Sequence, residues 1–110
     1  YVIVSIDGRG TGSRGNAFRA ATYAQLGKLE LDDQISGATY LKSLPYVDPA
    51  RVGIWGWSFG GYMTALCMTV GADHFKTGIS VAPVTTWRFY DTIYTERYLK
   101  RPQDNAAGYD

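Results

Sequence analysis

The sequence predicts an α/β fold, with a parallel sheet and helices on both faces. Three short apolar runs have the composition of strands, at residues 1–6, 51–55 and 77–81. Segments of helical periodicity and glycine-rich loops separate these runs. Strands that alternate with helices are joined by crossovers, which make the strands parallel and place the helices against the sheet. No repeat, linker or low-complexity tract interrupts residues 1–110, so we expect one continuous part of one domain.

The first predicted strand, residues 1–6, is a run of apolar and β-branched side chains interrupted only by Ser5. Such continuous apolarity is typical of a parallel strand that is buried on both faces. We therefore expect this segment to be a central strand of the sheet.

A helix is predicted over residues 29–44. Its apolar side chains recur at helical spacing, at Leu31, Ile35, Ala38, Leu41 and Leu44. Asp32 and Asp33 lie near its start, where the helix dipole favours negative charge. Pro45 and Pro49 follow, and we expect them to end the helix.

The loop between these elements contains a second motif, because Gly10-Thr11-Gly12-Ser13-Arg14-Gly15 matches G-x-G-x-x-G. In dinucleotide-binding folds such glycines open a helix directly, and an acidic residue about twenty positions later ends a second strand. Asp32 and Asp33 have that spacing but start a helix instead. We therefore interpret residues 8–15 as a loop that needs positive φ at several positions. Its place after a parallel strand puts it near the site crevice.

The most informative segment is Gly56-Trp57-Ser58-Phe59-Gly60, between the strand at 51–55 and a predicted helix at 62–70. It has the form of a nucleophile elbow, in which a sharp strand-to-helix turn holds a serine exposed and strained. Glycines two residues to either side reduce the crowding, with Gly61 as a third. We predict that Ser58 is a catalytic nucleophile. The alternative is a serine that only caps the following helix.

A serine nucleophile needs a histidine to accept its proton and a carboxylate to orient that histidine. The sequence has one histidine, His74. It follows the elbow helix, whose far end lies about 15 Å from its start. In elbow-bearing hydrolases the acid and then the histidine follow later strands. We expect His74 to be a surface residue and the catalytic acid and base to lie outside residues 1–110.

The segment after the last strand is aromatic. Trp87, Tyr90, Tyr94 and Tyr98 recur every three or four residues, as on one face of a helix. Such a stripe usually packs in a core. Beyond the carboxyl end of a strand it can also form the wall of a flat apolar pocket, of a size that accepts a proline ring.

Composition excludes some functions. The net charge is +1 and no basic cluster is present, so nucleic acid is not an expected partner. No apolar stretch approaches membrane length. We expect no cofactor and no metal. Cys67 is the only cysteine, so no internal disulfide can form, and we expect a buried structural thiol.

Taken together, the motifs resemble the dipeptidyl peptidase IV branch of the prolyl oligopeptidase family of serine peptidases. The resemblance rests on residues 7–10, 56–62, 81–84 and 90–98, and it covers nearly the whole chain. It implies a partial α/β-hydrolase fold, with residues 1–110 as the central part of the catalytic domain. The parent protein would also carry an N-terminal β-propeller.

The resemblance also implies roles for individual residues. Ser58 would be the nucleophile, and the backbone N–H of Phe59 would be one donor of the oxyanion hole. The proline-accepting S1 pocket would be lined by Phe59, Val84, Trp87, Tyr90 and Tyr94. The best-known members have tyrosine where this chain has Phe59, a change that alters the polarity of the pocket and keeps the backbone donor.

The implied function is release of X-Pro or X-Ala dipeptides from peptide substrates through an acyl-enzyme on Ser58. We expect residues 1–110 alone to be inactive, because the triad Asp and His, a second oxyanion donor and the propeller glutamates lie elsewhere. A homodimer and a periplasmic, secreted or cell-surface location are further implications. The alternatives are a carboxylesterase or lipase of the same fold, which would share Ser58, and a noncatalytic binding protein.

Overall fold

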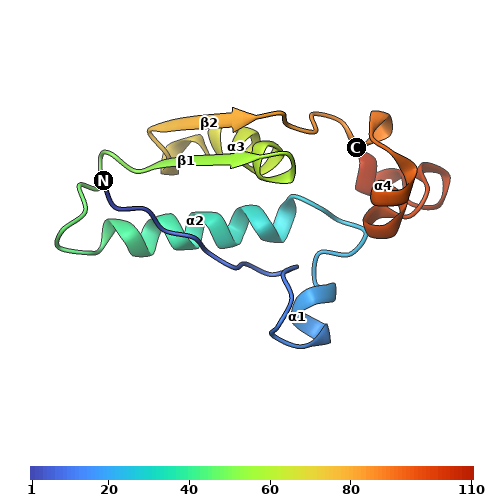
Figure 1. Ribbon diagram of the computed structural model, residues 1–110, viewed down its shortest axis with the longest axis horizontal. Coiled ribbons are helices and arrows are strands. Elements are labelled where there is room, and N and C mark those ends of the chain that lie inside the picture. Colours follow the sequence, from blue (N-terminus) through green and yellow to red (C-terminus); the bar gives the residue numbers. More distant parts are fainter.

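The computed structural model describes residues 1–110 (Figure 1). The two strands are β1 (Gly53–Trp57) and β2 (Thr77–Val81). The α-helices are α1 (Asn16–Ala20), α2 (Lys28–Lys42), α3 (Phe59–Thr69), α4 (Thr92–Leu99) and α5 (Ala106–Tyr109). Three 3-10 turns are η1 (Ala72–His74), η2 (Trp87–Phe89) and η3 (Pro102–Asp104).

A β-α-β unit forms the centre of the structure. β1 and β2 are parallel neighbours, in a register that runs from Gly53 opposite Thr77 to Trp57 opposite Val81. α3 packs against both strands, and α2 packs against α3 (Figure 1). The predicted parallel sheet with helices is confirmed. α3 begins at Phe59, three residues earlier than expected, because the turn at Ser58 joins strand and helix without a loop.

Two apolar clusters hold the elements together. The first joins α2 to the β-α-β unit through Leu31, Ala38, Val52, Met63, Cys67 and Phe75. The second lies beyond the end of β2 and contains Val84, Trp87 and Leu99. Phe59 and Tyr62, in the first turn of α3, pack against both clusters.

The helices cover only one face of the sheet in residues 1–110. On the other face the side chains of Trp55, Trp57 and Ile79 are more than half exposed. Trp55 and Ile79 are directly opposite each other across the two strands. The expectation of helices on both faces therefore holds for one face, because α3 packs against one set of the alternating side chains and no helix of residues 1–110 is packed closely against the other set.

The expectation that residues 1–6 form a central strand is not met. These residues run beside α2 without a strand partner, and they are exposed (Figure 1). A strand is defined by hydrogen bonds to a neighbour, and β1 and β2 pair only with each other. A groove of about 1410 Å³ lies between this segment, α2 and β1. The apolarity of residues 1–6 indicates burial, but no element of residues 1–110 supplies it.

None of the helices is both long and apolar enough to cross a membrane.

Candidate active site

Ser58 is held in a strained backbone conformation at the turn from β1 to α3. Its φ is 57° and its ψ is −112°. Positive φ is uncommon for residues other than glycine, and such strain is concentrated at functional sites. Ser58 occupies the position before the helix, but its side chain makes no capping hydrogen bond. The interpretation of Ser58 as an ordinary helix cap is therefore not supported, and its hydroxyl has no structural task at the helix start.

Backbone hydrogen bonds fix this turn to the end of β2. The Ser58 N–H donates to the Val81 carbonyl at 2.9 Å, and the Tyr62 N–H donates to the Ser58 carbonyl at 3.0 Å. The Ser80 hydroxyl donates to the Gly61 carbonyl at 2.8 Å. The position of Ser58 is therefore set by the sheet and the first turn of α3 together.

Two glycines make the turn possible. A Cβ at Gly56 would overlap the backbone of Gly60, and a Cβ at Gly61 would lie 2.6 Å from the Val81 carbonyl oxygen. A Cβ at Gly60 would meet nothing within 4 Å. The close approach thus requires Gly56 and Gly61, whereas the motif pointed to Gly56 and Gly60. Gly60 contributes the backbone that Gly56 approaches.

The backbone N–H of Phe59 belongs to the first turn of α3, directly after Ser58. The first N–H groups of a helix have no intrahelical acceptor, and the helix dipole favours negative charge there. This is suitable chemistry for stabilising an oxyanion that forms beside Ser58.

An aromatic cluster is centred on Trp87, whose side chain is 6% exposed. The ring of Tyr94 stacks on it with the planes 8° apart and the centroids separated by 5.9 Å. Tyr90 meets it edge to face at 6.0 Å, and Phe59 lies 5.9 Å away. Val84 is buried in the same cluster. The five side chains assigned to an S1 pocket therefore lie together, and one of them, Phe59, directly follows Ser58 in the chain.

The segment that carries this cluster is not a single helix. Trp87 lies in η2, Tyr94 lies in α4, and Tyr90 lies between them. Asp91 caps α4 by accepting a hydrogen bond from the Tyr94 N–H at 2.9 Å. Trp87 and Val84 are buried as in a core, whereas Tyr90 is 38% exposed. The cluster is thus packed like a core at Trp87 and Val84 and partly exposed at Tyr90, and its role as the wall of a substrate pocket stays a prediction.

Sequence reasoning missed one member of this cluster. The Tyr62 ring contacts Trp87 edge to face at 5.2 Å and Phe59 at 5.7 Å. Its hydroxyl donates to the Leu26 carbonyl at 3.2 Å. Burial raises the pKa of Tyr62, and the nearby Trp87 indole N–H partly offsets this rise. The Trp87 N–H is itself buried and has no hydrogen-bond partner within the usual distance and angle. The available signal was the spacing, since Phe59 and Tyr62 share a face of α3.

His74, the only histidine, is not placed to accept a proton from Ser58. His74 is in η1, beyond the end of α3 opposite to Ser58. The 11 residues of α3 correspond to about 16 Å. No group of His, Cys, Asp and Glu side chains is arranged to hold a metal ion. Cys67 is fully buried, as predicted, and burial raises the pKa of its thiol to about 11.

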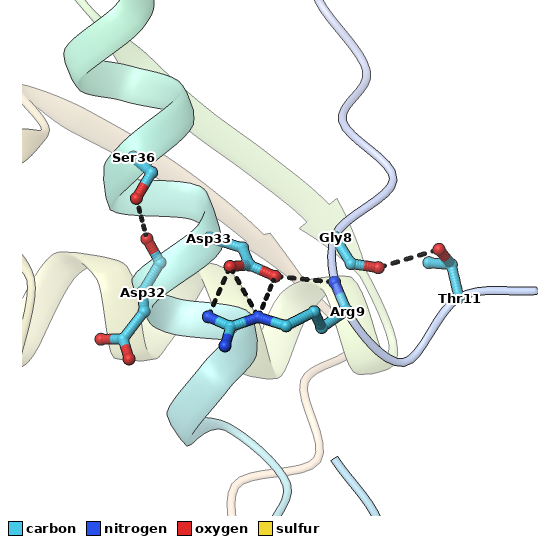
Figure 2. A network of polar contacts seen from close by, with 6 residues as sticks. All are labelled: Gly8, Arg9, Thr11, Asp32, Asp33 and Ser36. Carbon is cyan, nitrogen blue, oxygen red and sulfur yellow. Dashed lines mark hydrogen bonds and ion pairs between the residues drawn. The ribbon is translucent and has the colours of Figure 1, made fainter. Parts of the chain in front are cut away.

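The glycine-rich loop is anchored to α2 by one residue pair, Arg9 and Asp33 (Figure 2). Arg9 donates from its backbone N–H to Asp33 at 2.7 Å and from its guanidinium at 2.7 and 3.0 Å. These hydrogen bonds lower the pKa of Asp33. Gly10, Ser13 and Gly15 have positive φ, which confirms the prediction for this loop. Asp33 is occupied by Arg9 and therefore does not have the free carboxylate of a ribose site.

The fold and the elbow together define part of an α/β-hydrolase. A sequence profile of the prolyl oligopeptidase family matches residues 1–110, and the chain belongs to that family. It is 57% identical to a probable dipeptidyl-aminopeptidase B of Metarhizium robertsii, over 100% of this chain and 12% of that protein. The dipeptidyl aminopeptidase B of Saccharomyces cerevisiae is 51% identical, over 98% of this chain and 13% of that protein.

Solved structures agree with these sequence relatives. The crystal structure of Porphyromonas gingivalis dipeptidyl peptidase 4 superposes with a TM-score of 0.90 and 59% sequence identity. The match covers 94% of this chain and 15% of that one. The chain therefore resembles the dipeptidyl peptidase IV branch of the family, and it spans about an eighth of the length of the sequence relatives named above.

Proposed function

We propose that residues 1–110 are the central part of the catalytic domain of a serine peptidase, which releases X-Pro or X-Ala dipeptides from peptide N-termini. The observation that carries this proposal is the strained Ser58 beside an aromatic cluster centred on Trp87. The triad Asp and His and an N-terminal β-propeller would be supplied by other parts of the full-length protein.

In this mechanism the Ser58 hydroxyl attacks the carbonyl carbon of the second residue of the peptide, and the bond to the nitrogen of the third residue breaks. A histidine from elsewhere in the protein accepts the hydroxyl proton and passes it to the leaving amine. The Phe59 N–H donates to the oxyanion, and the loss of one such donor typically raises the barrier by about 3 kcal/mol. Water then hydrolyses the acyl-enzyme and regenerates Ser58.

The aromatic cluster favours a peptidase over an esterase of the same fold. A flat apolar pocket formed by Trp87, Tyr90 and Tyr94 suits the ring of proline, whereas ester hydrolysis at Ser58 has no need for it. Phe59 adds an apolar wall from the elbow helix. Alanine would fit the same pocket with less contact, so we expect proline to be preferred.

The unpaired edges and the bare face of the sheet affect how residues 1–110 would behave on their own. β1 and β2 form a two-stranded sheet with unpaired outer edges, and Trp55 and Trp57 are exposed on its bare face. Such edges and apolar patches promote aggregation. We therefore expect residues 1–110 alone to be inactive. A homodimer and a periplasmic, secreted or cell-surface location remain predictions for the full-length protein.

The decisive experiment measures hydrolysis of Gly-Pro-p-nitroanilide by the full-length protein, beside a p-nitrophenyl ester. We expect cleavage of the anilide to fall by about 10⁶-fold in Ser58→Ala, the loss typical of a triad serine. Cleavage of the ester alone would favour an esterase. Cleavage of neither would favour a noncatalytic protein.

A further inference from the structure

We infer that Tyr62 is a positioning residue that sets the shape of the S1 pocket, anchored through residues 24–27. This inference rests on the function proposed above and deepens it. Residues 24–27, which contact both Tyr62 and the end of α4, are termed the bracket. Tyr62 would not touch the substrate; it would act through Trp87.

The ring of Tyr62 supports the pocket from behind. It meets Trp87 edge to face with the planes 78° apart, and it lies on the same helix face as Phe59. Trp87 in turn stacks on Tyr94. Any displacement of the Tyr62 ring would therefore reach both Phe59 and Trp87, because closely packed interiors transmit changes of shape.

The hydroxyl of Tyr62 fixes that ring to the bracket. It donates to the Leu26 carbonyl, and Leu26 itself packs against the cluster of Val84, Trp87 and Leu99. Gly27 makes this approach possible: its φ is +93°, and a Cβ there would overlap the Tyr62 hydroxyl. The hydrogen bond from Tyr62 to Leu26 thus requires that position 27 carry no side chain.

The same bracket holds the helix that carries Tyr94. The Ala24 N–H donates to the Tyr98 carbonyl at 2.8 Å. The Asn105 side chain donates to the carbonyls of Ala24 and Leu99, both at 2.9 Å. The end of α4 is therefore joined to the bracket twice, directly by the hydrogen bond from Ala24 and indirectly through the Asn105 side chain.

Two walls of the pocket are consequently positioned by one short segment. Trp87 is supported by Tyr62, whose hydroxyl is bound at Leu26, and Tyr94 lies on the helix that is bound at Ala24. A proline ring would contact both walls, whereas the methyl group of alanine fills little of the pocket. Loosening the walls should therefore reduce proline cleavage more than alanine cleavage.

The test compares Tyr62→Phe with the wild type in the full-length protein, using Gly-Pro and Gly-Ala p-nitroanilides. Tyr40→Phe is the matched control, because Tyr40 is exposed on α2. We expect Tyr62→Phe to lower the proline-to-alanine ratio of kcat/KM by about fivefold, the size of effect that corresponds to one net hydrogen bond. The change should appear in KM for the proline substrate. Tyr40→Phe should leave the ratio unchanged.

Two further measurements separate the possible causes. The rate of Ser58 labelling by diisopropyl fluorophosphate reports the nucleophile without the pocket, and we expect it to be unchanged in Tyr62→Phe. Gly27→Ala should lower the proline-to-alanine ratio in the same direction. In the Tyr62→Phe background it should lower that ratio less, because groups in contact are not additive. Gly27→Ala would also decide the question if Tyr62→Phe could not be purified.

The outcomes distinguish this inference from the proposed function. An equal fall in both kcat/KM values, with the ratio unchanged, would show that Tyr62 only stabilises the fold and would overturn the inference alone. A wild-type protein that cleaves neither anilide would overturn the proposed function, and this inference with it.

Discussion

The elbow and the aromatic cluster lie side by side, yet the structure positions them by different means. Ser58 is fixed by backbone hydrogen bonds to Val81 and by glycines that allow close approach. Trp87 is fixed by side chains from Phe59, Tyr62, Tyr90 and Tyr94. The nucleophile therefore depends on backbone geometry, whereas the pocket depends on packing between segments that are distant in sequence.

The largest loss of stability is expected in the aromatic cluster, which is held together by side-chain packing. Trp87→Ala in the full-length protein should lower the free energy of unfolding by about 4 kcal/mol, the usual cost of truncating a buried aromatic residue. It should also reduce kcat/KM for Gly-Pro-p-nitroanilide more than for the alanine substrate. Urea denaturation and steady-state kinetics measure the two effects.

Phe89→Ala is the control for that substitution, because Phe89 lies in the same turn with 90% of its side chain exposed. We expect a change of less than about 0.5 kcal/mol, as for most surface positions. Equal losses in the two variants would contradict the central place of Trp87 in the cluster.

The second effect concerns the backbone of the elbow. Gly61→Ala should destabilise the protein by about 2 kcal/mol, because a Cβ there is forced against the Val81 carbonyl oxygen. Labelling of Ser58 by diisopropyl fluorophosphate should slow as the turn is displaced. Gly60→Ala is the matched control: no atom lies near its Cβ, and alanine favours a helix by up to about 1 kcal/mol. Similar behaviour of the two variants would refute the assignment of the close approach to Gly61.

The third effect is smaller, since it concerns a pair that is partly exposed to solvent. Asp33→Asn removes the carboxylate that binds Arg9, and we expect a loss of about 1 kcal/mol at pH 7. The hydrogen bonds from Arg9 lower the pKa of Asp33 in the folded protein. The contribution of the ionised carboxylate is therefore fully present above the pKa of the unfolded chain, about 3.9.

This contribution should disappear as the pH falls through the lower pKa of the folded state. Denaturation of the wild type and Asp33→Asn between pH 7 and pH 3 measures the difference. A gap in stability that stays constant throughout this range would show that the carboxylate charge does not contribute.

The smallest effect is a difference in reactivity at Cys67, in the core of the β-α-β unit. Burial raises its pKa to about 11, so the thiolate is scarce at pH 8 and the sulfur is inaccessible. We expect iodoacetamide to modify the peptide that contains Cys67 only after denaturation, as followed by mass spectrometry. Modification of the native protein would show that α3 opens readily.

The sequence predicted the β-α-β unit well because its signals are local. β-branched and apolar residues mark β2, glycines mark the elbow, and the strand-turn-helix order places Ser58. Spacing marked Trp87, Tyr90 and Tyr94 as one aromatic stripe, whereas Val84 and Phe59 were added by the resemblance to a family. The structure brings all five together. Their role in substrate binding stays a prediction.

Two features could not be predicted from local pattern. Residues 1–6 have the composition of a central strand, but pairing depends on a neighbour that residues 1–110 do not provide. The contact from Tyr62 to Leu26 joins residues 36 positions apart. Nothing in the periodicity of either segment indicates that meeting, because it depends on how α2 and α3 pack.

By itself the sequence determined the order of elements, the serine at the elbow and the family of the chain, since each is encoded by residues that are close neighbours. Only the tertiary structure decided which face of the sheet the helices cover, which glycines the turn requires and what holds the aromatic cluster. These depend on approach distances between separate segments. A Cβ at Gly27 or Gly61 is excluded by atoms that arrive from elsewhere in the chain, and no local pattern records them.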